Sequence, residues 1–299
     1  MAKNKRLKLI IVVGPTASGK SDLAIDIAKK VDGEVVSADS RQVYLGMDIG
    51  SGKITKKEMR GVPHHMLDIV SPKVEFNVVH FKKKAEKIIK QIATRKKTPI
   101  VAGGTGFWID SLLYDFKLPE VGPDTKLRKE LDKKTTVQLF EQLKKLDPAR
   151  AETVDEKNRR RLIRALEIAI KTGKPVPTLK KKLKYDALII GIKRPQKELE
   201  ERIYKRLVAR LKEGMIDEIK RLHESGVSWK RLDNFGLEYR YVSRYLRGLL
   251  DYDQMVDETY RAIKRYAKRQ MTWFKRNKDI VWVDDPRGAI KLLSAFPQA

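Results

Sequence analysis

The chain has 299 residues, enough for about two domains and a sizeable buried core. Its 66 Lys and Arg exceed its 39 Asp and Glu by 27, which indicates a polyanionic partner, although a lysine-rich proteome would also give such an excess. The absence of cysteine excludes disulfides, a cysteine nucleophile and cysteine-based zinc modules, and predicts a cytoplasmic protein.

The first predicted elements are a strand and a helix joined by a phosphate-binding loop. The apolar run 9–13 leads directly into GPTASGKS (14–21), so it indicates a strand and not a signal peptide. The loop fits G-x-x-x-x-G-K-[ST], in which backbone N–H groups surround an anion. Lys20 would contact a terminal phosphate, and the Ser21 hydroxyl would bind Mg²⁺. The alternative is an ordinary glycine-containing turn.

Two later strands also end in polar residues. The apolar run 34–37 is followed by Asp39, which could bind Mg²⁺, act as a general base, or cap a helix. The run 99–102 leads to two glycines and Thr105, which could donate to a phosphate or serve as a cap. A helix is predicted over 76–97 between them. Strands alternating with helices predict a parallel sheet that binds its ligand at the strands' carboxyl ends.

The paired histidines His64 and His65 invite comparison with a zinc site. Adjacent residues of an extended segment point to opposite sides, and no third histidine or cysteine is near in the sequence. A structural or substrate-contacting role is therefore favoured over zinc.

Residues 119–184 differ from the rest in character. They contain helical segments broken by LDPA and KTGKPVP, no clear strand, and 19 Lys and Arg against 10 Asp and Glu, a net charge of +9. In NRRRLIRALEI (158–168), Arg160 and Arg164 share a helical face, while Leu162 and Ile163 can pack inward. The basic face is either solvated or a clamp on a phosphate backbone.

The remaining elements return to the sheet. A strand is predicted over 185–192, helices over about 195–225 and 251–276, and a last strand over 280–285. The predicted fold class is α/β, a P-loop NTPase-like parallel sheet core with an inserted small helical domain. The core has two parts, 1–118 and 185–299, and the insertion is 119–184. No apolar run approaches the ~20 residues of a membrane span, so no membrane is expected.

Six stretches together resemble one family, the tRNA dimethylallyltransferases (tRNA isopentenyltransferases). They are GPTASGKS, SADSRQVY, PHHMLD, GGTGFWI, NRRRLIRALE and YAKRQMTWFKRNKDIVWVD, in the family's order. The resemblance implies transfer of a dimethylallyl group from dimethylallyl diphosphate to the N6 amine of the adenosine 3′-adjacent to the anticodon. It also implies Mg²⁺ as cofactor, the tRNA anticodon stem-loop as partner, and a monomer. The family's eukaryotic zinc finger is absent, which implies the bacterial type.

The resemblance also implies roles for single residues. Asp39 would be the general base, Thr105 and Lys20 would act on the leaving group, and Gln42 would bond the adenine edge. The implied diphosphate-binding residues are Gly14, Pro15, Thr16, Ala17, Ser18, Gly19, Lys20, Ser21, Arg202 and Arg206, with Ser21 also on Mg²⁺. The implied tRNA-binding residues are Asp39, Ser40, Arg41, Gln42, Thr105, Arg128, Arg160, Arg161, Leu162, Ile163 and Arg164.

Three alternatives stay open at this stage. An adenylate isopentenyltransferase would act on a free nucleotide, and an ATP-dependent small-molecule kinase would use the same loop and Asp39. A non-catalytic RNA-binding protein would need only the basic surface. Two segments, 234–242 and AETVDEKN, depart from the family's pattern, and no contacts are predicted there.

Overall fold

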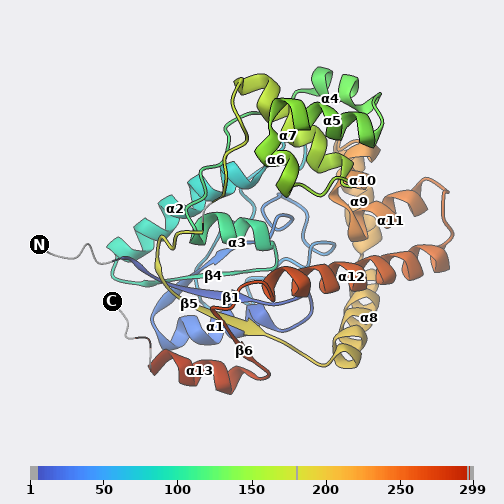
Figure 1. The fold of residues 1–299 in the computed structure, drawn as a ribbon. Coiled ribbons are helices and arrows are strands. Elements are labelled where there is room, and N and C mark those ends of the chain that lie inside the picture. The colour runs from blue at the N-terminus through green and yellow to red at the C-terminus, as the bar shows by residue number, and fades with distance from the viewer. Residues whose placement is uncertain (1–5, 180, 295, 297–299) are drawn as a thin grey trace, which may run out of the picture. The chain divides into compact units, whose positions relative to one another are not determined.

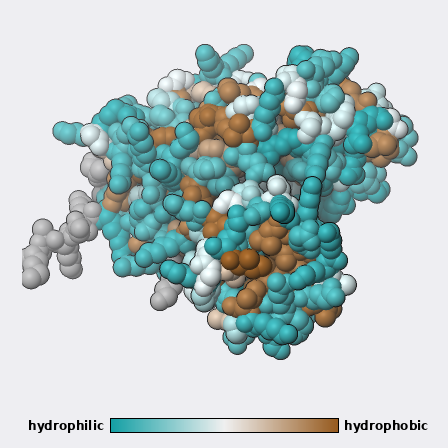
Figure 2. Space-filling view, turned by 90° about the horizontal axis from the view of Figure 1, so that it is seen from above, coloured by the Kyte–Doolittle hydropathy of each residue, from teal (hydrophilic) through white to brown (hydrophobic). Residues whose placement is uncertain are grey.

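The protein divides into two compact units. The structure is a computed structural model that describes residues 6–179, 181–294 and 296. The larger unit comprises Met1–Leu113 and Leu183–Ala299, and the smaller unit is Tyr114–Lys182 (Figure 1). The smaller unit therefore begins and ends a few residues before the insertion expected at 119–184. Hydrophilic side chains cover most of the face seen in Figure 2, with hydrophobic patches between them.

A six-stranded parallel sheet forms the centre of the larger unit, in the order β3-β2-β4-β1-β5-β6. This confirms the predicted α/β fold class. The strands are β1 (Lys8–Val13), β2 (Gly33–Ser37), β3 (His64–His65), β4 (Thr98–Gly103), β5 (Asp186–Ile192) and β6 (Ile280–Val283). All of β4, and all of β1 after Lys8, is buried, as parallel strands covered on both faces require.

The register of the central strands brings three loops to one edge of the sheet. Val13 at the end of β1 pairs with Gly103 at the end of β4, and Ser37 at the end of β2 pairs with Ala102. The loops that follow Val13, Ser37 and Gly103 therefore leave the sheet side by side. They are the phosphate loop, the Asp39 loop and the Thr105 loop, so the site lies at the carboxyl edge of the sheet.

Nine helices of the larger unit are described. They are α1 (Lys20–Lys30), α2 (Val78–Thr94), α3 (Gly106–Leu113), α8 (Gln196–Lys212), α9 (Met215–Glu224), α10 (Trp229–Phe235), α11 (Leu237–Leu246), α12 (Tyr252–Phe274) and α13 (Pro286–Ser294). The single helix predicted over 195–225 is wrong, because Gly214 at φ +94° separates α8 from α9. The last strand stops at Val283, and α13 begins soon afterwards.

Apolar residues of α1 pack on the sheet and form the main core. Leu23 and Ile27 are fully buried with Ile10 and Ile100, and Leu293 of α13 joins the same cluster. Fully burying each such side chain stabilises the fold by about 1.5–3 kcal/mol. The core thus fixes the helix that begins at Lys20 against the strands whose ends carry the site. Among the described residues, no helix is long and apolar enough to span a membrane.

The smaller unit contains helices only, within the part of it that the structure describes. They are α4 (Thr125–Asp132), α5 (Thr136–Leu146), α6 (Pro148–Thr153) and α7 (Arg159–Thr172). The LDPA break between α5 and α6 contains Asp147, whose carboxylate accepts from the N–H of Arg150 at 3.0 Å and of Val176 at 2.6 Å. The core of the smaller unit is lined by leucines of α4, α5 and α7. Leu162 and Ile163 of α7 lie in that core.

Candidate active site

The phosphate loop has the backbone shape of an anion cradle. Ala17 at φ +63° and Gly19 at φ +94° are in the left-handed region, so the chain winds tightly before α1 begins at Lys20. Successive N–H groups in such a turn, together with a helix N-terminus, attract an anion. An alanine at positive φ is strained, and strain of this kind is typical of functional loops. The conformation favours an anion-binding loop over an ordinary turn.

Three arginines hydrogen-bond to this loop. Arg202 donates from Nε to the carbonyl of Ala17 at 2.8 Å, and Arg206 donates to the Thr16 hydroxyl. Arg194 donates from Nε to the carbonyl of Ser18 at 2.8 Å. The sequence analysis named Arg202 and Arg206 but missed Arg194. Its signal is position, since it follows β5 at the sheet edge where the loop lies.

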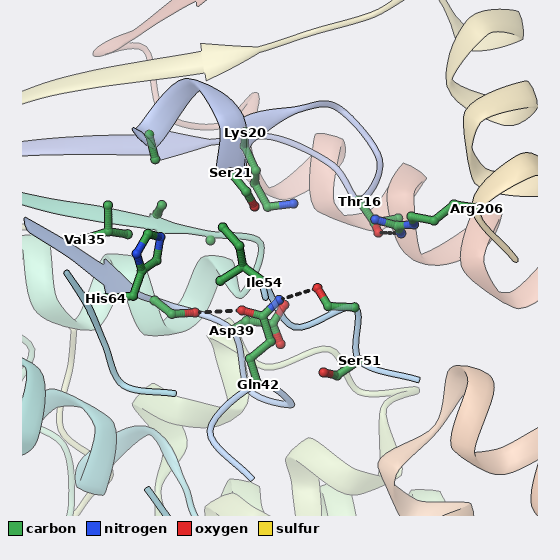
Figure 3. A pocket seen from close by; sticks show the side chains of 15 residues that line it. Thr16, Lys20, Ser21, Val35, Asp39, Gln42, Ser51, Ile54, His64 and Arg206 are labelled. Carbon is green, nitrogen blue, oxygen red and sulfur yellow. Dashed lines mark hydrogen bonds between the residues drawn. The ribbon is translucent and has the colours of Figure 1, made fainter. Parts of the chain in front are cut away.

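The loops at the sheet edge enclose one pocket within the larger unit (Figure 3). The structure brings together six predicted residues from three separate segments in its lining. They are Thr16, Lys20, Ser21, Asp39, Gln42 and Arg206. The rest of the lining includes His64, Ser51 and Gly52. Lys20 and Ser21 come from the start of α1, and Asp39 from the end of β2.

The cationic side chains of Lys20 and Arg206 are buried beside other cations, which disfavours their charged forms. Burial, helped by Arg206 and Arg210 and opposed by Asp39, lowers the pKa of Lys20 to about 8. Burial and Arg210 lower the pKa of Arg206 to about 9. A bound polyanion would relieve this repulsion, because opposite charge favours the charged form of both groups. The electrostatics of the pocket therefore suit a diphosphate or a triphosphate.

Asp39 and Thr105 lie on adjacent loops, but only Asp39 is among the residues that line the pocket. Asp39 is half-buried and accepts from the backbone N–H of Arg41 at 2.8 Å within a turn, so it does not cap a helix. The Thr105 hydroxyl oxygen accepts from the backbone N–H of Ser40 at 3.1 Å. Tyr266 of α12, which the sequence analysis missed, hydrogen-bonds Thr105. Burial and the charge of Asp39 raise the pKa of Tyr266 to about 12, so its hydroxyl stays protonated.

Gln42 is already engaged by the protein. Its side-chain oxygen accepts from the Ser37 hydroxyl at 3.1 Å, and its Nε2 donates to the carbonyl of Gly52 at 3.0 Å (Figure 3). A hydrogen bond from Gln42 to an adenine would have to add to these contacts or replace one of them. Arg41 likewise points away from the pocket lining, donating from Nε to the carbonyl of Phe235 at 2.8 Å. This contact shows that the segment 234–242 lies beside the Asp39 loop.

The two histidines lie on opposite sides of β3, as the alternation of a strand requires. His64 lines the pocket, its Nδ1 is 2.8 Å from the carbonyl of Val62, and burial lowers its pKa, so it is neutral at pH 7. His65 Nε2 is 2.7 Å from the Glu34 carboxylate. Within the described part of the chain, no group of three or more His, Cys, Asp or Glu could hold a metal ion.

The basic residues predicted in the smaller unit separate into two kinds. Arg128 and Arg164 both bond the fully buried carboxylate of Glu167, with Arg128 Nη2 at 2.8 Å from Oε2. Burial would raise the pKa of Glu167, but hydrogen bonds from Arg128, the Asp124 backbone and Arg164 lower it. Arg160 and Arg161 are exposed instead. The shared face of Arg160 and Arg164 is thus not a uniform clamp.

Two of the predicted tRNA contacts are corrected. Leu162 is 0 % exposed and Ile163 is 8 % exposed, because both fill the core of the smaller unit. Their side chains cannot contact RNA in this structure.

A family model described as "IPP transferase" matches residues 42–277. The chain is 39 % identical over 289 residues to the tRNA dimethylallyltransferase of Pelotomaculum thermopropionicum, covering 94 % of this chain and 92 % of that protein. It is 42 % identical over 272 residues to tRNA dimethylallyltransferase 1 of Geotalea uraniireducens, covering 90 % and 88 %. These relatives match nearly the whole length of both chains.

Solved structures give the same picture. The tRNA isopentenylpyrophosphate transferase of Bacillus halodurans superposes with a TM-score of 0.73 at 37 % identity, over 97 % of this chain and 95 % of that one. A eukaryotic dimethylallyltransferase acting on tRNA superposes with a TM-score of 0.80 at 28 % identity, over 93 % and 74 %.

Proposed function

The chain belongs to the IPP transferase family, and from this premise we propose that it transfers a dimethylallyl group from dimethylallyl diphosphate to tRNA. The acceptor is the N6 amine of the adenosine 3′-adjacent to the anticodon. The observation that carries the proposal is the pocket, where a cation-crowded phosphate loop faces a carboxylate. A leaving diphosphate needs the positive charge of the loop, and an attacking amine needs the carboxylate to take its proton. The tRNA and donor bind here as substrates of a monomer in the cytoplasm.

The phosphate loop would hold the donor's diphosphate. Its N–H groups, Lys20 and the arginines at 202 and 206 supply positive charge where the diphosphate gains negative charge as it leaves. Charge placed in advance at that position lowers the barrier, and losing one such group typically costs 10²–10³-fold in rate. Mg²⁺ fits the hydroxyl oxygen of Ser21 in the lining, and when bound it would neutralise part of the diphosphate charge.

Asp39 would act on the acceptor. The amine nitrogen forms a bond to the allylic carbon, the carbon–oxygen bond to the diphosphate breaks, and Asp39 takes the amine proton. Such a base must lie within hydrogen-bond reach of the nitrogen. Thr105, which bonds the loop of Asp39 through Ser40, would contact the diphosphate from the other side. The adenosine must leave its stack to reach the pocket, as bases do in other modifying enzymes.

The exposed arginines of the smaller unit would bind the tRNA backbone. Arg160 and Arg161 are free of the Glu167 cluster and lie on the surface of α7. Together with the net charge of +27, they suit the anticodon stem. This replaces the wider set of residues at 160–164 expected from the sequence.

The test is a labelled-transfer assay with three acceptors. Labelled dimethylallyl diphosphate is incubated with an anticodon stem-loop, with the same stem-loop carrying guanosine at the acceptor position, and with adenosine monophosphate. Label in the first alone is expected, because guanosine has no N6 amine. Label in the free nucleotide would support an adenylate isopentenyltransferase. Phosphate transfer from γ-labelled ATP to a small molecule would support a kinase instead.

A further inference from the structure

The segment YAKRQMTWF has no role in the mechanism above, although it lies on α12 beside the site. Three of its residues, Tyr266, Gln270 and Trp273, occur at spacings of four and three, which places them on one face of the helix. All three contact the segment 104–110 that carries Thr105. The face is therefore the support of the Thr105 loop.

Gln270 makes the contact that reaches beyond that loop. Its side-chain oxygen accepts from the backbone N–H of Thr16 at 2.8 Å, and its Nε2 donates to the carbonyl of Gly104 at 3.0 Å. One amide thus joins the phosphate loop to the loop of Thr105. Gln270 is 5 % exposed, so neither bond competes with bulk water.

The pairing demands an amide. The phosphate loop presents an N–H and the other loop presents a carbonyl, so the bridging group must accept at one end and donate at the other. A methionine of similar size cannot donate and accepts only weakly, and an ionised carboxylate can only accept. Glycine at position 104 leaves room for this contact, because a Cβ there would overlap the Gln270 amide.

Trp273 fixes the far end of the Thr105 segment. Its Nε1–H donates to the Asp110 carboxylate at 3.0 Å, and its ring lies where a side chain at Gly106 would be. The segment 104–110 is thus held at its start by Gln270 and at its end by Trp273. Beyond the pairing of Val13 with Gly103 at the strand ends, the Gln270 side chain thus links the phosphate loop directly to the Thr105 loop.

We propose that Gln270 is a positioning residue for the transfer reaction, which sets the spacing between the loop that holds the diphosphate and the loops that carry Thr105 and Asp39. This inference rests on the proposed function. Gln270 touches neither substrate directly in this account. It acts on the rate because reacting atoms displaced by about 1 Å can lose on the order of 10²-fold in rate.

The test compares three variants in single-turnover transfer to the stem-loop. Gln270→Met, which removes both bonds, should lower the transfer rate about 10–100-fold while the affinities for dimethylallyl diphosphate and for the stem-loop change less than about threefold. Met255→Ala, at a buried position on the same helix, is the stability control and should keep the wild-type rate. A wild-type rate in Gln270→Met overturns the inference, as does a rate that falls only in proportion to donor affinity.

Gln270→Glu provides a signature that a purely structural residue would lack. A protonated carboxyl both donates and accepts, as the amide does, whereas the ionised form cannot donate to Gly104. The rate of Gln270→Glu relative to wild type should therefore rise as the pH falls from 8 to 6, and a ratio independent of pH would contradict the inference. This variant also serves if Gln270→Met fails to fold. No transfer by the wild-type protein would instead overturn the proposed function.

Discussion

Ser40 donates its backbone N–H to the hydroxyl oxygen of Thr105 at 3.1 Å, although 65 positions separate them in the chain. The contact joins the loops that follow β2 and β4. It places Thr105 beside Ser40, the neighbour of Asp39, so the loops of the proposed base and the proposed diphosphate contact are hydrogen-bonded to each other. A conservative substitution at Asp39 should therefore change the chemistry of the site and leave the contact between the two loops in place.

Asp39→Asn should separate the roles of base and metal ligand. The asparagine side-chain oxygen can still accept from the Arg41 N–H, so the turn should persist. Single-turnover transfer should fall roughly 10²–10⁴-fold, the usual scale for a lost general base. Affinity for the donor with Mg²⁺, measured by calorimetry, should stay near wild type.

The Asp39→Asn variant also tests the alternative, in which Asp39 binds the metal ion. A collapse of donor affinity together with the rate would assign Asp39 to the metal site. The natural control is Ser21→Ala, which removes the proposed Mg²⁺ ligand and should weaken donor binding in the presence of Mg²⁺.

Donor binding should depend on pH through Lys20. The pKa of Lys20 is lowered to about 8 in the free protein, so above pH 8 the amine loses its charge. A bound diphosphate favours the ammonium and raises that pKa. Binding should thus take up a proton between about pH 8 and the raised pKa, and affinity should fall as pH rises through this range.

Calorimetry in two buffers of different ionisation enthalpy measures this uptake. The wild type should take up more protons at pH 8.5 than Lys20→Met, with the difference vanishing near pH 6.5, where the amine is already charged. Equal uptake by the two proteins at pH 8.5 would show that Lys20 does not meet the diphosphate. Lys20→Met should also lower transfer by about 10²–10³-fold.

The arginines of the smaller unit should divide into structural and binding residues. Arg164→Ala removes a hydrogen bond to the buried Glu167 and one to the carbonyl of Val121, and should destabilise the unit by about 1–3 kcal/mol. Hydrogen exchange of residues 114–182 measures this loss. Unchanged protection would mean that Arg128 and the Asp124 N–H satisfy Glu167 without Arg164.

Arg160→Ala and Arg161→Ala should do the reverse. Both side chains are exposed, so stability should change by less than about 0.5 kcal/mol. Each lost phosphate contact should make the log–log salt dependence of tRNA binding shallower by about 0.7–0.9. If the slope is unchanged in the double variant, this face is only solvated.

Glu218 should be important for the wall of the pocket. Its buried carboxylate accepts from the backbone N–H of Asp48, Ile49 and Gly50, at 2.9, 2.6 and 3.0 Å, and from the Tyr239 hydroxyl. Ser51 and Gly52, which follow directly, line the pocket. Glu218→Ala leaves these donors without partners and should cost about 2–4 kcal/mol. Urea unfolding measures the loss, and Glu224→Ala, exposed on the same helix, should be near neutral.

The sequence alone predicted the parallel sheet and the phosphate loop, because both are local patterns. A buried parallel strand is a continuous apolar run, and the loop requires glycine at fixed positions before a helix. Asp39 and Thr105 were found for a related reason: both follow strands, and the carboxyl ends of parallel strands meet at one edge. Gly214 was missed as a helix break, since the apolar pattern continues on both sides of it.

Only the tertiary structure decided which of these side chains are held by other parts of the fold and which stay exposed. Arg160 and Arg164 look alike in sequence, yet Arg164 bonds the fully buried carboxylate of Glu167, whereas Arg160 is exposed. Gln270 lies 254 positions from Thr16, and no local pattern specifies a hydrogen bond over that distance. Such contacts depend on how whole helices pack. The sequence determined which groups are present at each strand end, and packing determined what each one touches.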